Sequence, residues 1–177
     1  SKEAFYFIGG IMNHIKGMTL ILNPLVNSYK RLGGGDEAPS YIAWSTMNRS
    51  PLIRIPSSKG ANKRVELRSP DPSANPYLAF AVCLAAGLDG IEKQTMPPAA
   101  VKENLYHMSE QSRREKDIEL LPDDLHKAIC AFKEDTFIRE VIGEHIATKY
   151  IAAKEKEWER YCTQVTDWEV NEYLYKI

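Results

Sequence analysis

The chain changes from strand to helix within one stretch, which reads Arg64-Val65-Glu66-Leu67-Arg68-Ser69-Pro70-Asp71-Pro72-Ser73-Ala74-Asn75-Pro76-Tyr77-Leu78. Charged and apolar residues alternate over its first five positions, which predicts a strand, because successive side chains of a strand lie on opposite faces. Prolines at 70 and 72 then mark a turn. A helix is expected over 76–92, since Asn75 suits an N-cap and Pro76 suits the first helical position. This helix is apolar nearly all round, so we expect it to be deeply buried.

Further strands are expected before this stretch. Residues 41–46, 51–56 and 63–68 all have strand-like composition and spacing. Residues 27–40 precede them and read as a loop, because Asn23-Pro24 interrupts a helical pattern and three glycines occupy 33–35.

Helices are expected at both ends of the chain. The first is indicated by apolar residues at helical spacing, at positions 7, 8, 11, 12, 15 and 18. Residues 94–121 read as irregular, one helix follows Pro122, another runs from Ile138 to about Gln164, and a short one begins at Asp167. The predicted fold class is α+β, with short antiparallel strands followed by a mostly helical C-terminal half. No linker divides residues 1–177, so they are expected to form one unit.

The composition is that of a globular protein. The chain has 177 residues, of which 44% are hydrophobic and 27% charged, and its net charge is -1. The lack of a basic excess argues against a nucleic-acid partner, and no apolar run reaches the ~20 residues of a membrane span. Three cysteines lie far apart with no Cys-x-x-Cys pair. Free thiols in a reducing cytosol, and hence a cytoplasmic protein, are the expectation.

Arginines are concentrated in the predicted loop and strands. Five occur within 38 residues, at Arg31, Arg49, Arg54, Arg64 and Arg68. A guanidinium group pairs bidentately with carboxylate or phosphate, so a cleft lined by several of them would suit an amino acid and a nucleotide triphosphate. The alternative is that each is a solvated charge or a structural ion pair.

Two carboxylates are candidates for chemistry. Glu66 shares a strand face with Arg64 and Arg68, about 7 Å from each. It can be an ion-pair partner or a ligand for a hard divalent cation. Glu37 follows the glycines and is either a solvated charge or a general base delivered by loop closure.

Several motifs in order resemble those of type I bacterial glutamine synthetases. They are Asn27-Ser28-Tyr29-Lys30-Arg31-Leu32, Glu37-Ala38-Pro39, Asn48-Arg49-Ser50-Pro51-Leu52-Ile53-Arg54-Ile55-Pro56, Arg64-Val65-Glu66-Leu67-Arg68, Asp71-Pro72, Ala74-Asn75-Pro76-Tyr77-Leu78, Ala86-Gly87-Leu88-Asp89-Gly90-Ile91 and Asn104-Leu105-Tyr106. The resemblance covers essentially the whole chain and implies the C-terminal part of the catalytic domain.

The resemblance implies ATP-dependent ligation of ammonia to glutamate through γ-glutamyl phosphate, with Mg²⁺ or Mn²⁺ as cofactor, in a cytoplasmic dodecamer. Matched by motif, the catalytic residues would be Glu37 and Arg49. The roles of the others would be glutamate binding by Arg31 and Arg68, together with Glu37 and Arg49, nucleotide binding by Arg54 and Arg64, and metal ligation by Glu66. Tyr106 matches a tyrosine that is adenylylated in one subclass, although the residues after it resemble the feedback-regulated subclass that lacks this control.

Parts of the family pattern are not found in this sequence. The N-terminal β-grasp domain, the Glu-x-Glu segment and the other metal-binding glutamates are absent from these 177 residues. The isolated chain is therefore expected to be inactive. Two alternatives are a catalytically silent paralogue that binds a nucleotide or amino acid, and a γ-glutamyl-polyamine ligase of the same superfamily.

Overall fold

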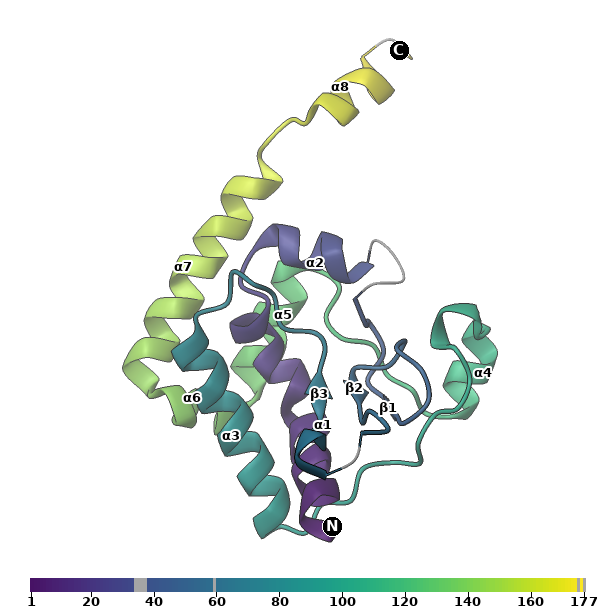
Figure 1. The fold of residues 1–177 in the computed structure, drawn as a ribbon. Helices are drawn as coiled ribbons and strands as arrows, with labels where there is room; N and C mark the ends of the chain where they lie inside the picture. The colour runs from purple at the N-terminus through teal and green to yellow at the C-terminus, as the bar shows by residue number, and fades with distance from the viewer. Residues whose placement is uncertain (34–37, 59, 175, 177) are drawn as a thin grey trace.

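The fold is an assembly of helices beside a very small sheet (Figure 1). A computed structural model describes residues 1–33, 38–58, 60–174 and 176. Its elements are α1 (Lys2–Leu22), α2 (Val26–Gly33), β1 (Trp44–Ser45), β2 (Ile53–Arg54), η1 (Gly60–Asn62), β3 (Glu66–Leu67), α3 (Pro76–Glu92), η2 (Leu105–His107), α4 (Glu110–Glu115), α5 (Leu125–Glu134), α6 (Thr136–Ile142), α7 (Glu144–Cys162) and α8 (Asp167–Tyr173). The predicted α+β class is confirmed.

Helices α1 and α3 cross with their backbones in contact, side by side in Figure 1. A Cβ atom built on Gly10 would lie 2.1 Å from the carbonyl oxygen of Ala86, and one built on Gly90 would lie 2.2 Å from that of Tyr6. Neither position has room for any side chain, so glycine at both positions sets the distance between the two helices.

The core forms on the inward face of α1. Ile8, Ile15 and Met18 are fully buried there and belong to the same apolar cluster as Ile129 and Phe132 of α5. Burial of each such side chain stabilises the folded state by roughly 1.5–3 kcal/mol relative to leaving it exposed to water. The helices predicted near the N-terminus and after Pro122 are therefore confirmed, and each follows from its apolar spacing.

A buried histidine joins three helical segments. His14 on α1 contacts Asp135, between α5 and α6, through Nδ1 at 2.9 Å, and Asp89 on α3 through Nε2 at 3.2 Å. Its ring stacks on Phe137, and Lys93 pairs with the other oxygen of Asp89 at 2.8 Å. The hydrogen bond that His14 donates to Asp135 outweighs the effect of burial, and the pKa of His14 is raised. His14, when protonated, donates to two carboxylates across the helix interfaces.

Residues 27–33 are helical, so the predicted loop over 27–40 is wrong for its first half. Helix α2 buries Tyr29 and Leu32 on one side. Two apolar residues three positions apart are a helical signal, and their burial outweighs the turn signal of Asn23-Pro24, which only separates α1 from α2. The glycines at 34 and 35 and Glu37 lie outside the described residues.

The three predicted strands are present but shorter, and only one pairing is antiparallel. β1 and β2 pair in parallel, with Trp44 opposite Ile53, whereas β2 and β3 pair antiparallel, with Arg54 opposite Glu66. The prediction of antiparallel strands is therefore wrong for β1 and β2. The segment between them does not fold back as a hairpin, because side chains of residues 48 and 50 bond to the distant residues 102–105.

Two helical predictions need correction downstream. The helix expected from Ile138 to about Gln164 is divided at Gly143, whose φ of 84° suits glycine and ends α6 before α7 begins. Residues 94–121 are not wholly irregular, because η2 and α4 lie within them. Asn104 and Ser109 cap these two short elements.

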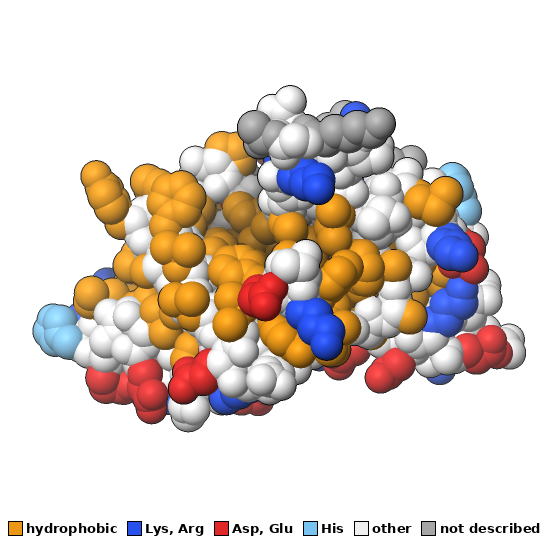
Figure 2. All heavy atoms as spheres, turned by 60° about the horizontal axis from the view of Figure 1, so that its bottom comes forward, with side chains coloured by type: hydrophobic (Ala, Val, Ile, Leu, Met, Phe, Trp, Pro, Cys, Tyr) orange, Lys and Arg blue, Asp and Glu red, His pale blue; other side chains and the backbone are white. Residues whose placement is uncertain are grey.

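Helix α3 is much less buried than its composition predicts. Four large apolar side chains of α3 are exposed: Tyr77 by 84%, Phe80 by 68%, Leu84 by 56% and Leu88 by 59%. Figure 2 shows hydrophobic side chains gathered around a hollow on the face that includes the lower ends of α1 and α3 in Figure 1. The prediction of deep burial is therefore wrong for this face of α3, because the described residues pack against its other face only.

The end of the chain extends away from the helical body. Helix α7 leads to α8, which lies beyond the other helices in Figure 1 and exposes Trp168 and Tyr173. The helix predicted from Asp167 is confirmed, with a Thr166–Glu169 capping box at its start. None of the helices in the described part of the chain is both long and apolar enough to span a bilayer.

The α1–α3 crossing predicts a strong effect of one added methyl group. Gly90→Ala would force the two backbones apart, and we expect it to lower the free energy of unfolding by about 3 kcal/mol. Gly33→Ala is the matched control, because no described atom outside its own stretch of helix lies within 4 Å of the position that its Cβ would take. Chemical unfolding of both variants would measure this. Equal stability of the two would contradict the close crossing.

The His14 contacts predict pH-dependent stability. Because the pKa of His14 is raised above 6.5 in the fold, its contribution is complete below that pH and is lost as the pH rises through the folded-state pKa. Burial opposes ionisation of Asp89, but Lys93 and His14 outweigh the effect of burial and lower the pKa of Asp89. The contribution of the His14–Asp89 pair to stability is therefore lost at acidic pH, as the pH falls through the lowered pKa of Asp89. We expect His14→Gln to cost about 2 kcal/mol near neutral to mildly acidic pH and less at alkaline pH. A pH series of thermal unfolding would test this, and a pH-independent difference would contradict it.

Candidate functional site

The antiparallel pairing of β2 and β3 brings a carboxylate between two arginines. Arg54 Nη1 donates to Glu66 Oε2 at 3.1 Å, and Arg64 reaches Glu66 Oε1 through Nε at 2.9 Å and Nη2 at 2.8 Å. Burial opposes ionisation of Glu66, but the hydrogen bonds from Arg64 and Arg54 outweigh it, so the pKa of this carboxyl is lowered. Glu66 is therefore held as a carboxylate in a basic surrounding.

Arg68 directly follows β3 and extends the arginine cluster that begins with Arg54 and Arg64. Its Nη1 donates to the carbonyl oxygen of Pro51 at 3.4 Å. Burial lowers the pKa of Arg68, and the nearby charges of Arg49 and Arg54 lower it further, while Tyr106 and Glu66 oppose them. Arg49, Arg54 and Arg68 are thus close enough for their charges to interact, although they come from three different segments.

Arg31, on α2, contacts the turn that follows Arg68. Its Nη2 donates to the carbonyl oxygen of Ser69 and, at 3.2 Å, to Asn23 Oδ1. Its Nε lies 3.5 Å from the Asp71 carboxylate. These contacts connect α2 to the turn that follows β3, and they bring Arg31 next to the residue after Arg68.

Tyr106 contacts the segment that follows Glu37. Its hydroxyl donates to the carbonyl oxygen of Ala38 at 3.3 Å, and its ring meets Tyr41 edge to face at 6.4 Å between centroids. Tyr106 also contributes to the electrostatic surroundings of Arg68, whose pKa it raises. The side chain of Glu37 itself is outside the described residues.

Arg49 lies in the turn between β1 and β2 and is exposed. Its neighbours Asn48 and Ser50 are not, and both bond to residues 102–105. Sequence reasoning assigned no role to Asn48 or Ser50. The only sequence feature that could have indicated a role for them is that an asparagine and a serine flank an arginine. Their hydrogen-bond partners are more than 50 residues away in the sequence.

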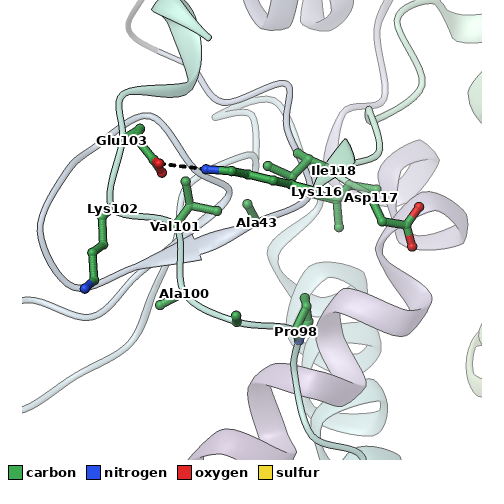
Figure 3. Close-up of a pocket in the computed structure, with 11 residues that line it drawn as sticks. Ala43, Pro98, Ala100, Val101, Lys102, Glu103, Lys116, Asp117 and Ile118 are labelled. Carbon is green, nitrogen blue, oxygen red and sulfur yellow. Dashed lines mark hydrogen bonds and ion pairs between the residues drawn. The ribbon is translucent and has the colours of Figure 1, made fainter. Parts of the chain in front are cut away.

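Two pockets of similar size differ in their relation to the predicted residues. One, of about 410 Å³, lies between residues 98–103 and 116–118 with the Lys116–Glu103 ion pair across it (Figure 3), and none of the predicted site residues lines it. The other, of about 430 Å³, has apolar walls from Phe5, Ile8 and Val65 and a basic edge from Lys63 and Arg64. This second pocket adjoins the arginine cluster through Arg64.

Glu66 can supply at most one part of a metal site. Both of its oxygens accept from arginine, yet a carboxylate has about four lone-pair positions, so further coordination by a hard cation is chemically open. Among the residues that the structure describes, no three His, Cys, Asp or Glu side chains gather in a way that could hold a metal ion. A metal bound at Glu66 would need its other ligands from elsewhere in the protein.

Comparison with known proteins identifies relatives over nearly the whole chain. A family model described as "Glutamine synthetase, catalytic domain" matches residues 1–173. A glutamine synthetase of Thermotoga maritima is 54% identical over 175 residues, covering 99% of this chain and 40% of that protein. Those of Clostridium saccharobutylicum and Thermus thermophilus are 51% and 50% identical, covering 40% and 39% of their lengths.

Solved structures agree with this relationship. A structure titled as a GmaS/ADP complex has a TM-score of 0.86 and 38% sequence identity, covering 98% of this chain and 40% of that one. GmaS without ligand gives a TM-score of 0.82 at the same identity and covers 99% of this chain and 39% of that one. The chain thus spans about 40% of the length of the relatives it matches.

From the arginine cluster we predict that Glu66 makes a modest, salt-dependent contribution to stability. Glu66→Gln removes the negative charge between Arg54 and Arg64, and we expect a loss of about 1 kcal/mol at low salt that shrinks in about 1 M salt. Glu110→Gln, which affects an exposed pair with Arg114, is the control and is expected to change little. Unfolding at two salt concentrations would measure both, and a salt-independent loss would contradict this account.

Proposed function

Because this chain belongs to the glutamine synthetase catalytic-domain family, we propose that the protein carrying it ligates ammonia to glutamate with ATP as co-substrate. The family match over residues 1–173 is the observation that carries the proposal. The identity of 54% with a glutamine synthetase, against 38% with GmaS, favours this activity over other ligases of the same fold.

The reaction would proceed in two displacements. An oxygen of the glutamate side-chain carboxylate attacks the γ-phosphorus of ATP, and ADP leaves. Ammonia then attacks the resulting acyl phosphate, loses a proton, and phosphate leaves. Both steps gather negative charge on phosphoryl oxygens, and fixed cationic donors stabilise such charge most when water is excluded.

The arginine cluster supplies those cationic donors in the proposal. Arg49 would stabilise the transferring phosphoryl group and also contact substrate, and Arg54 would bind nucleotide phosphates. Arg31 and Arg68 would bind glutamate, and their proximity through Ser69 supports a shared ligand. Glu37 would accept the proton of ammonium.

The pocket beside Arg64 supports nucleotide binding. Its apolar walls suit a flat base and its basic edge suits phosphates, and its volume of about 430 Å³ is within the usual range for small-molecule sites. The related GmaS structure is titled as an ADP complex. We therefore assign Arg64, with Arg54, to the nucleotide.

Mg²⁺ or Mn²⁺ is the proposed cofactor, with Glu66 as one ligand. The bound cation would screen the phosphates during transfer. Arg54 and Arg64 hold the Glu66 carboxylate ionised and orient it, which is the state that a hard cation requires.

The assembly is also a proposal. We propose a cytoplasmic dodecamer, in which the apolar side of α8 contacts another subunit and the exposed apolar side of α3 is covered by the rest of the catalytic domain. Trp168 and Tyr173 are exposed on α8, and Phe80 and Leu84 are exposed on α3, which supports both contacts. Adenylylation of Tyr106 stays a prediction for this chain. Its hydroxyl is part-buried and bonded to Ala38, which disfavours modification in this conformation.

The test is a steady-state assay of the full-length protein with glutamate, ATP and Mg²⁺, comparing ammonia with methylamine and putrescine. We expect glutamine formation, with kcat/KM for ammonia at least about tenfold above that for either amine. The 177-residue chain alone is expected to show no turnover, because its described carboxylates do not complete a metal site.

Other outcomes would identify the alternatives. Preference for an amine would point to an amine ligase. Binding of ATP or glutamate without turnover would point to a silent paralogue. Turnover by the 177-residue chain would contradict its expected inactivity.

A further inference from the structure

The turn that carries Arg49 is held by a network of hydrogen bonds, one of which, from Leu105 N–H to Ser50, is buried. Ser45, at the end of β1, is 1% exposed, and Ser50, at the end of the turn, is 3% exposed. Ser45 Oγ accepts from the backbone N–H of Met47 at 3.1 Å. The turn therefore begins and ends inside the protein, while Arg49 between these ends is exposed.

Asn48 ties the middle of this turn to a remote segment. Its Nδ2 donates to the carbonyl oxygens of Glu103 at 3.0 Å and Lys102 at 3.2 Å. Its Oδ1 accepts from both the backbone N–H of Ser50 at 3.0 Å and the Ser50 hydroxyl at 2.8 Å. One side chain thus fixes the turn internally and externally.

Ser50 makes the second tie. Its Oγ accepts from the backbone N–H of Leu105 at 2.9 Å, and Leu105 is fully buried. Without that oxygen the buried N–H of Leu105 would lose its partner, which costs more than the bond contributes. The 102–105 segment is itself anchored to β1, because Val101 N–H donates to the carbonyl oxygen of Trp44.

We propose that Asn48 and Ser50 are positioning residues for Arg49, because they fix the backbone on both sides of it to residues 102–105. This inference rests on the proposed role of Arg49 in phosphoryl transfer. An exposed arginine has many rotamers, so a fixed backbone is what limits where its guanidinium group can lie. Misplacement of a catalytic group by about 1 Å can cost about 100-fold in rate.

Two variants test separately the hydrogen bonds of Asn48 and of Ser50 to residues 102–105. Asn48→Asp keeps an oxygen for Ser50 but places the other carboxylate oxygen against the carbonyls of Lys102 and Glu103. Ser50→Ala removes the acceptor for Leu105. In the full-length protein we expect each to lower kcat by roughly 10- to 100-fold, a larger change than any in KM for glutamate or ATP, because the charge that Arg49 stabilises is greatest in the transition state.

A double-mutant cycle distinguishes positioning from general damage. In the Arg49→Ala background, Ser50→Ala is expected to change kcat by less than about twofold, since no guanidinium remains to be positioned. Ser109→Ala, which removes the N-cap hydroxyl of α4, is the control and should leave kcat unchanged in both backgrounds. An equal loss of kcat from Ser50→Ala with and without Arg49 would overturn the proposal.

Hydrogen exchange tests the same network without turnover. Asn48→Asp should lower amide protection of residues 46–50 and 102–105 together and leave α5 unchanged. Unchanged protection of the turn would overturn the inference. Absence of ligase activity in the unmutated protein would instead refute the proposed function, and the exchange result would still decide whether the turn is held by these residues.

Discussion

The contact between the backbones of α1 and α3 is the constraint on which the other elements depend. Gly10 and Gly90 allow the two helices to touch, and a side chain on either would meet main-chain atoms. Because main chain cannot move aside as a side chain can, this distance is rigid. It brings His14 within reach of Asp89 and so determines where α6 and Asp135 can pack.

The sheet, by contrast, is too small to hold the arginine cluster alone. Each strand has two residues, so few ladder hydrogen bonds connect them. Side chains provide the missing connections: Glu66 joins Arg54 to Arg64 across β2 and β3. The geometry of the cluster is consequently sensitive to single polar side chains outside the regular elements.

The exposed side of α3 explains how a strongly apolar helix can lie at a surface. A helix that is apolar all round needs partners on every side, and α1 and α6 contact α3 from one side only. The curated relatives are about two and a half times as long as this chain, which covers 40% of the Thermotoga maritima protein. The remainder of such a protein would cover Phe80 and Leu84, which are exposed in this chain.

Local pattern was sufficient for most helices, for the strand positions and for the α+β class, because apolar spacing and caps such as Asn75 act within a few residues. Motif order also identified the family. Local pattern failed at α2, at the parallel pairing of β1 with β2 and at the exposure of α3. It also gave no role to Asn48 or Ser50. Each of these depends on partners distant in the chain, and hydrogen bonds between residues 55 positions apart leave no periodic trace in a sequence.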